Sequence, residues 1–337
     1  MSIVRIFIVF IVCGVTSMGF NAAAQQCHQL ASLKLPDTKI VMAESVQAGA
    51  FTWPGDSTPI GPPVDFKTLP AFCRVTAVAK PTSDSEIKFE VWMPESKWNG
   101  KFEGTGNGGW LGAIIYPALA EGLRRGYAVA NTDTGHVSGV MDASWTLGHP
   151  EKIVDFGYRA VHLMTVQAEA IVTAFYKRSP AYSYWNGCSS GGKQGLKEAQ
   201  RFPEDYNGIV AGAPANYWTH LTAATVWLGL QALNREGSYI PKEKFSLIHK
   251  AAVESCDSVG GIRDGVIDNP KKCHFDPKVL QCQGSDAPNC LTAAQVETAR
   301  KVYAPATAPH GTQFFPGFEP GSELGWGFLC ITAGRTH

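Results

Sequence analysis

The residues best suited to covalent chemistry lie at 187–191, where the sequence reads Gly-Cys-Ser-Ser-Gly. An aromatic run at 182–185 predicts a buried strand before this turn, and the helix formers at 192–200 predict a helix after it. A serine in such a strand–turn–helix setting points outward at a helix N-terminus. We therefore predict Ser189 as a nucleophile, with the N–H of Ser190 stabilising an oxyanion. The alternative is an ordinary glycine-rich turn with a solvent-facing serine.

A second glycine-rich stretch at 104–112 follows a segment, 98–103, that leads out of an early strand. In α/β-hydrolase folds, the loop after an early strand supplies the second oxyanion donor. We assign that role to the N–H of Gly109, with Gly108 as the neighbouring possibility. A phosphate-binding loop is excluded because the stretch lacks the Gly-Lys-Ser/Thr ending, and no acidic residue stands at the distance expected of a dinucleotide site.

A polar cluster containing Asp133 and His136 follows a buried strand predicted at 127–131. Ligands bind at the carboxyl ends of strands in open α/β sheets, so these two residues are candidates for acid and base. Both precede the serine, which contradicts the hydrolase order of serine, acid and histidine, and we expect them instead to brace their loop by hydrogen bonds. His162 lies in a helix predicted at 155–176, where we expect it to pack rather than to bind a ligand.

The first 24 residues have the pattern of a secretory signal, with Arg5, an apolar run at 6–15, and small residues ending at Ala24. We expect an exported chain that begins at Gln25 and is secreted or periplasmic. An N-terminal membrane anchor is the alternative, but the apolar run is too short to span a bilayer.

Of the nine cysteines, only Cys13 lies in the predicted leader, and the others would be exposed to an oxidising compartment. Disulfides are therefore expected. No pair has the C-x-x-C spacing of a zinc site, which excludes zinc binding through cysteine. The expected pairs, chosen by proximity in sequence and by the loops they would close, are Cys27–Cys73, Cys256–Cys273 and Cys282–Cys290.

Composition and patterning predict one large domain with an insertion. Lysine plus arginine equals aspartate plus glutamate at 29 each, so the sequence has no electrostatic signature of nucleic-acid binding and favours a neutral or aromatic partner. Alternating strands and helices at 25–215 predict a mostly parallel sheet, preceded by an irregular segment up to Pro70 and by antiparallel strands near 73–79 and 87–93. The helical, aromatic and cysteine-rich region at 216–337 is expected to form a lid.

An acidic loop lies between Cys256 and Cys273. Asp257, Asp264 and Asp268 stand among glycines and free carbonyls, which is the ligand type that calcium requires. The alternative is a disulfide-closed acidic turn without metal.

The sequence resembles the tannase and feruloyl esterase family, which includes a hydrolase of mono(2-hydroxyethyl) terephthalate. The resemblance rests on stretches that occur in the family's order across nearly the whole mature chain. These stretches are 69–75, 98–102, 106–109, 131–136, 155–160, 187–192 and 264–268.

The resemblance implies a secreted α/β-hydrolase with a lid that cuts esters of phenolic acids by a Ser-His-Asp mechanism. By position it makes Ser189 the nucleophile and Ser190 and a glycine of the Gly108–Gly109 pair the oxyanion donors. The calcium ligands that it implies are Asp257, Asp264 and the carbonyls of Ile262 and Val266. Gly260 stands where the family has an aspartate, which would weaken calcium binding.

The resemblance also implies that the family's acid and base lie beyond the lid, whereas this sequence ends at His337. In the family, the residue beside the catalytic histidine is a cysteine bridged to the position of Cys188. We therefore expect the C-terminal part of the fold to be absent and the esterase activity to be impaired. Two alternatives are a non-catalytic protein that binds aromatic ligands through its lid and a nonfunctional fragment. The sequence does not identify the ester.

Overall fold

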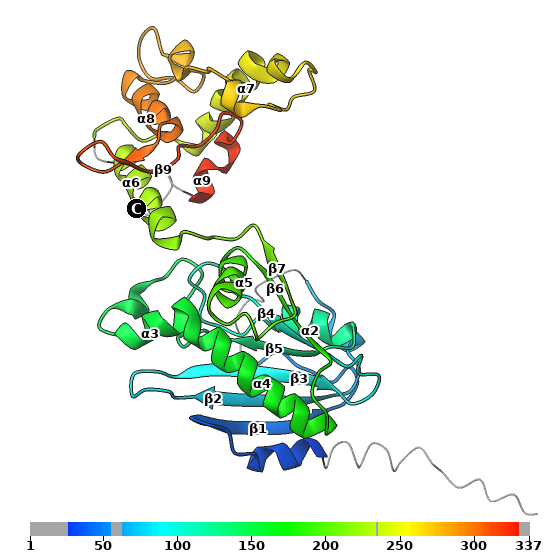
Figure 1. Cartoon of the computed structure of the whole chain (residues 1–337). Coiled ribbons are helices and arrows are strands. Elements are labelled where there is room, and N and C mark those ends of the chain that lie inside the picture. Colours follow the sequence, from blue (N-terminus) through cyan, green and yellow to red (C-terminus); the bar gives the residue numbers. More distant parts are fainter. Residues whose placement is uncertain (1–25, 55–62, 234, 330–337) are drawn as a thin grey trace, which may run out of the picture. The chain divides into compact units, whose positions relative to one another are not determined.

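The computed structural model describes residues 26–54, 63–233 and 235–329. The chain divides into two compact units, Met1–Asn216 and Tyr217–His337, each with its own hydrophobic core (Figure 1). We call them the N-terminal and the C-terminal unit. No helix in these three ranges is both long and apolar enough to cross a bilayer. The leader predicted at 1–24, together with Cys330 and His337, lies outside the described residues.

The N-terminal unit contains a seven-stranded sheet in the order β1-β2-β3-β5-β4-β6-β7. Antiparallel pairing joins β1 to β2, β2 to β3 and β3 to β5, and parallel pairing joins β5, β4, β6 and β7. Five of the seven strands therefore run in one direction, as the prediction of a mostly parallel sheet requires. The strands are β1 Thr38–Val46, β2 Phe72–Ala79, β3 Ile87–Pro94, β4 Lys101–Thr105, β5 Ala128–Thr132, β6 Tyr182–Cys188 and β7 Gly208–Gly212.

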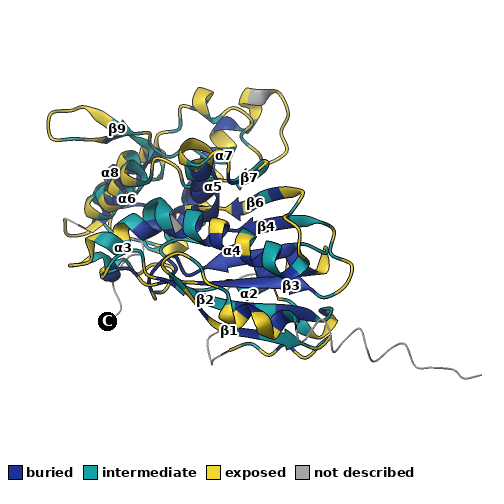
Figure 2. Ribbon diagram, turned by 60° about the horizontal axis from the view of Figure 1, so that its bottom comes forward, coloured by how far each residue is buried: buried dark blue, intermediate teal, exposed yellow. Residues whose placement is uncertain are grey.

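Helices cover both faces of this sheet because alternate strand residues are apolar on both sides. Val91 and Ala130 face one core, which they share with α4, whereas Trp92 and Val129 face the other core, beside α2. Buried residues accordingly concentrate along the strands beneath α4, as Figure 2 shows. The helices are α2 Tyr116–Arg124, α3 Pro150–Val154, a π-helical turn Asp155–Arg159, α4 Ala160–Tyr176 and α5 Ser190–Arg201.

The segment predicted to be irregular up to Pro70 contains β1, which is an edge strand. Its register shifts by a bulge between Ile40 and Met42, and its two buried residues, Ile40 and Ala43, are three positions apart. A bulge breaks the period-2 alternation that marks a strand in sequence, and the prediction was wrong here for that reason. The disulfide between Cys27 and Cys73 joins the start of the described chain to β2.

The C-terminal unit is mostly helical. Its core is built from aliphatic and aromatic side chains of all its longer helices, among them Leu228, Ile248, Val296 and Trp326. Its elements are α6 Trp218–Leu233, α7 Phe245–Cys256, α8 Ala293–Tyr303, the short hairpin β8 Ala306–Thr307 and β9 Gln313–Phe315, and α9 Trp326–Leu329.

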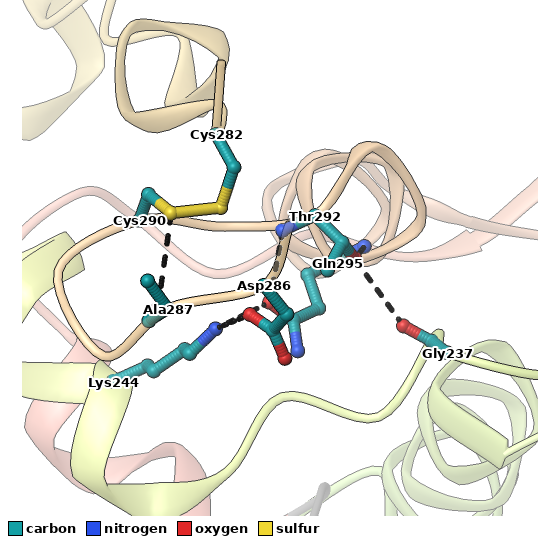
Figure 3. The surroundings of a disulfide bond; sticks show 8 residues. All are labelled: Gly237, Lys244, Cys282, Asp286, Ala287, Cys290, Thr292 and Gln295. Atoms are coloured by element: carbon teal, nitrogen blue, oxygen red, sulfur yellow. Dashed lines mark hydrogen bonds and ion pairs between the residues drawn. A yellow bond between two sulfur atoms is a disulfide. The ribbon is translucent and has the colours of Figure 1, made fainter. Parts of the chain in front are cut away.

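A disulfide between Cys282 and Cys290 closes a small loop of this unit (Figure 3). Beside it, the buried Lys244 ammonium contacts Asp286 and donates to Gln295 Oε1 at 3.0 Å. Gln295 also completes a capping box at the start of α8. Disulfide, ion pair and cap together fix the irregular loop 282–290, which leads into α8.

Candidate active site

Ser189 lies in a strained turn between β6 and α5. Its φ is 60° and its ψ −119°, a conformation that costs a non-glycine residue about 1–3 kcal/mol. Backbone hydrogen bonds hold the turn in place: the Ser189 N–H donates to Gly212 O, and Ser189 O accepts from Lys193 N and Ala215 N, all at 3.0 Å. The side chain is solvent-exposed, whereas the next residue, Ser190, is fully buried.

Three glycines allow this turn to form because their backbones touch. A Cβ on Gly106 would lie 2.4 Å from Gly191 Cα, and a Cβ on Gly187 would lie 2.5 Å from Gly191 C. Real Cβ atoms do not approach so closely, so a larger residue at any of these positions would push the turn and the 104–112 loop apart.

The loop at 104–112 is clamped onto the start of α5. Gly191 N donates to Asn107 O at 2.8 Å, and Ser190 Oγ donates to Gly109 O at 2.8 Å. Asn107 N in turn donates to Gln194 Oε1, one turn further along α5, at 3.1 Å. The clamp brings Gly109 into contact with Ser190, the residue after the predicted nucleophile, although 80 residues separate Gly109 from Ser189 in the chain.

Some N–H groups beside Ser189 take part in no hydrogen bond of the described chain. In the loop, the N–H groups of Gly106, Asn107, Trp110, Leu111 and Gly112 all donate to protein oxygens. No hydrogen bond found in the described ranges uses the N–H of Gly108, Gly109 or Ser190. These are the groups assigned from sequence, and Ser190 is also the first residue of α5, where a helix N-terminus favours negative charge.

The other polar cluster, at the end of β5, is buried and hydrogen-bonded. Asp133 Oδ1 accepts the N–H groups of Lys88 at 2.9 Å and Gly135 at 2.8 Å, and burial raises the pKa of Asp133 to about 7. His136 Nε2 lies 2.8 Å from Trp110 O, and burial lowers the pKa of His136. Both residues brace their loop as expected, and each is less than 5% exposed.

The described N-terminal unit holds four histidines, and each has a ring nitrogen bound to a group other than Ser189. The pairs are His28 with Ala43 O, His136 with Trp110 O, His149 with Asp84 and His162 with Asp205. None of the described residues supplies a histidine that is hydrogen-bonded to the Ser189 hydroxyl. His162 stacks on Phe202 with ring centroids 3.7 Å apart, so it packs as predicted, but it also contacts an acidic side chain.

The acidic loop of the C-terminal unit brings two predicted calcium ligands together. Asp257 Oδ1 accepts the N–H groups of Asp264 and Gly265, both at 3.2 Å, and Asp264 Oδ1 accepts Val266 N–H at 3.1 Å. Each of these bonds uses only one oxygen of its carboxylate, and the loop is closed by the Cys256–Cys273 disulfide. Two carboxylates beside exposed backbone carbonyls fit calcium in part, since calcium takes six to eight oxygens.

All three disulfide pairings predicted from sequence are present. Cys188 is exposed and forms no disulfide with any other cysteine in the described residues. The bond from Ser190 Oγ to Gly109 O was not predicted, because no local sequence pattern indicates which distant residue a serine hydroxyl will contact.

A family model described as "Tannase and feruloyl esterase" matches residues 73–327. An uncharacterized esterase from Xanthomonas campestris is 42% identical over 300 residues, covering 89% of this chain and 51% of that protein. A probable feruloyl esterase B-2 from Aspergillus flavus is 36% identical, covering 86% of this chain and 56% of that protein. The chain therefore spans about half the length of the curated relatives it matches.

Solved structures agree with this result. The crystal structure of feruloyl esterase B from Aspergillus oryzae superposes with a TM-score of 0.81 at 30% identity, covering 93% of this chain and 62% of that one. Tannin acyl hydrolase from Aspergillus niger superposes at 0.65 with 21% identity, covering 89% and 57%, and shows a shared fold. Both similarities extend over most of the described chain.

Proposed function

The chain belongs to the tannase and feruloyl esterase family, and we propose that it cleaves esters of phenolic or other aromatic acids with Ser189 as its nucleophile. One observation carries this proposal: an exposed serine at φ 60° stands beside N–H groups that no hydrogen bond in the described chain uses. The aromatic acid part rests on the relatives named feruloyl esterase.

In this mechanism the Ser189 oxygen attacks the ester carbonyl and forms a tetrahedral intermediate. The N–H groups of Ser190 and Gly109 donate to its oxyanion, with Gly108 as the neighbouring possibility. The alcohol leaves with a proton, and an acyl group stays on Ser189. Water then attacks the acyl carbon, which releases the acid and restores the hydroxyl.

We further propose that the 337-residue chain performs this reaction slowly. The described histidines of the N-terminal unit are bound to other groups, so none of them is placed to take the Ser189 proton. In a serine hydrolase, losing the triad costs about 10⁶ in kcat and leaves the oxyanion hole and substrate binding. The Ser189-dependent rate should therefore be small but above that of water.

Chemical rescue tests two proposals: that Ser189 is the nucleophile, and that the reaction is slow because no described histidine of the N-terminal unit is placed to take its proton. Hydrolysis of methyl ferulate would be followed with and without added imidazole, using Ser189→Ala as the matched control and methyl hexanoate as the aliphatic comparison. We expect a slow Ser189-dependent rate that rises with imidazole and is larger for the ferulate. Equal rates in Ser189→Ala would contradict the nucleophile. Turnover within the ordinary range of about 1–10³ s⁻¹ without imidazole would contradict the proposal that the reaction is slow.

We propose that the protein is exported. Three disulfides support this location, because disulfides form and persist in oxidising compartments. Expression of the full 337-residue chain in a bacterium, followed by fractionation and N-terminal sequencing, tests it. Export with a mature end at Gln25 is expected, and cytoplasmic protein that retains Met1 would contradict the proposal.

We propose that the acidic loop of the C-terminal unit binds calcium as a structural ion through Asp257, Asp264 and the carbonyls of Ile262 and Val266. Support comes from the backbone bonds that place the two carboxylates on one closed loop. The thermal midpoint should rise with calcium in the wild type and not in Asp264→Asn. Asp286→Asn, in the separate loop closed by Cys282 and Cys290, is the control that should keep the response. A calcium response that persists in Asp264→Asn would contradict the assignment.

A further inference from the structure

A cluster of ligand-type side chains lies in the N-terminal unit at the far end of the helix that begins beside Ser189. His162 comes from α4, Glu198 from the last turns of α5, and Asp205 from the turn before β7. One ligand atom from each lies within 4.8 Å of the others, and no comparable group of three is found elsewhere in the described residues. The esterase mechanism uses none of the three.

Glu198 has no partner that balances its charge. Its side chain is fully buried, and within the described chain neither carboxylate oxygen receives a hydrogen bond from a donor group. The neighbouring Asp205 is also buried, at 8% exposure, and burial together with the Asp205 charge raises the pKa of Glu198. Two buried carboxylates that face one another need a positive group between them, either a shared proton or a cation.

The third side chain is held so that it can complete a cation site. The His162 ring stacks on Phe202 at an interplanar angle of 11°, which fixes its orientation, and its Nδ1 lies 2.7 Å from Asp205 Oδ2. The imidazole side chain is 27% exposed, so an ion can reach the cluster from solvent. Ligand atoms around tetrahedral zinc lie about 3.3 Å apart, and a shift of several tenths of an ångström at His162 would therefore accommodate the ion.

We propose that His162, Glu198 and Asp205 bind one first-row divalent metal ion, with Zn²⁺ as the probe that identifies the site. One imidazole and two carboxylates suit such an ion, whereas calcium and magnesium prefer oxygen ligands alone. Two carboxylates supply a charge of −2 that the ion neutralises. The bound ion joins the C-terminal end of α5 to α4 and so stabilises the helix that begins directly after Ser189.

Metal content and stability test the proposal on the intact 337-residue chain. The protein, without an affinity tag, is freed of metal with a chelator, returned to 1 mM Ca²⁺ so that the acidic loop does not respond, and titrated with Zn²⁺. We expect one zinc per chain and a higher thermal midpoint, with no such effect from added Mg²⁺. X-ray absorption at the zinc edge should show only nitrogen and oxygen ligands at about 2.0–2.2 Å.

Glu198→Gln removes one ligand and keeps the side-chain shape. Its amide can donate a hydrogen bond to Asp205, so we expect the variant to fold. Its zinc affinity should fall by more than the roughly 10–100-fold that loss of an outer-sphere partner costs. The matched control is His149→Asn, which breaks an exposed histidine–aspartate pair with no third ligand in the described chain and should leave zinc binding unchanged.

Three results would overturn the metal site. Wild-type protein that retains no zinc and melts at an unchanged temperature would show that Glu198 and Asp205 share a proton instead. Sulfur in the zinc coordination shell would assign the binding to the exposed thiol of Cys188. Unchanged affinity in Glu198→Gln would place the ion elsewhere. The first two results come from the wild type alone, so they decide the question even if the variant does not fold.

Discussion

Two loops of the N-terminal unit begin where parallel strands end, and each contains a non-glycine residue with a φ of 60°. Thr134 follows β5, and Ser189 follows β6. Thr134 is fully buried, and its N–H donates to Thr132 Oγ1 at 3.1 Å while its hydroxyl lies 3.3 Å from His136 Nδ1. Ser189 has the same φ but is exposed to solvent.

A positive φ therefore does not by itself mark a residue suited to catalysis. In the β5 loop, Asp133 and His136 have the types that acid–base chemistry needs, yet both are buried and bound to backbone groups. In the β6 turn, by contrast, the hydroxyl is accessible and the N–H groups of Ser190 and Gly109 are unused by the described hydrogen bonds. Accessibility together with unused donors distinguishes the loop that we propose to be reactive from the supporting one.

Paired alanine substitutions give the largest expected difference between the loops. Ser189→Ala should abolish the imidazole-rescued ester hydrolysis, since no acyl-enzyme can form without the hydroxyl. Thr134→Ala should retain it, because the hydrogen bonds of Thr134 go to Thr132 and His136 and not to Ser189. Initial rates of ferulate release from both variants measure the contrast, and a Thr134→Ala protein as inactive as Ser189→Ala would break the comparison.

The pH dependence of stability tests the buried β5 loop. Because the pKa of Asp133 is raised to about 7 in the folded state, its stabilising contribution is complete below about pH 4. That contribution is lost as the pH rises towards 7, at roughly 1.4 kcal/mol per pH unit at most. Asp133→Asn keeps an oxygen for both N–H donors and does not titrate. In urea unfolding at pH 4 to 8, the free energy of unfolding of the variant should increase relative to that of the wild type as the pH rises. A difference that does not change with pH would contradict the raised pKa of Asp133.

The close contact between Gly106 and Gly191 can be tested by adding a side-chain atom at Gly106. Gly106→Ala places a Cβ 2.4 Å from Gly191 Cα, and we expect it to lower the free energy of unfolding by about 1–3 kcal/mol. Gly139→Ala, whose Cβ would meet nothing within 4 Å, is the control and should be nearly neutral. Denaturant midpoints measure both changes. Equal stability of the two variants would show that the contact between the two turns is dispensable.

The smallest expected effect concerns the clamp between the two turns. Ser190→Ala removes the hydroxyl that donates to Gly109 O at 2.8 Å but keeps the backbone N–H. We expect a loss of about 1 kcal/mol in unfolding free energy and a several-fold slower ester hydrolysis, because the second oxyanion donor is held less firmly. A change in stability without any change in the imidazole-rescued rate would show that the clamp does not position that donor.

Local patterns predicted part of this molecule well. The antiparallel pair β2 and β3, the strand–turn–helix around Ser189, and the loop carrying Gly109 follow from alternation and glycine placement. Strand β1 was missed because a bulge after Ile40 disrupts its alternation. Helix α8 also received no prediction, although Thr292 and Gln295 form the capping box that marks its start.

Local sequence patterns did not predict the contacts between segments that are distant in the chain. His162 and Asp205 are 43 residues apart, and nothing in their spacing suggests that they meet Glu198 behind α5. The bond from Ser190 Oγ to Gly109 O likewise depends on how the sheet orders β4 and β6. Residue type and local pattern were enough to propose Ser189 as the nucleophile, whereas the groups that surround it could be found only from the tertiary structure.

Covalent labelling tests the central claim most directly. The 337-residue protein would be incubated with a fluorophosphonate in the presence of imidazole, digested, and analysed by peptide mass spectrometry. The account predicts one adduct on Ser189, none on Thr134 or Ser190, and none in Ser189→Ala. An unmodified Ser189, or an adduct of equal yield in Ser189→Ala, would contradict it.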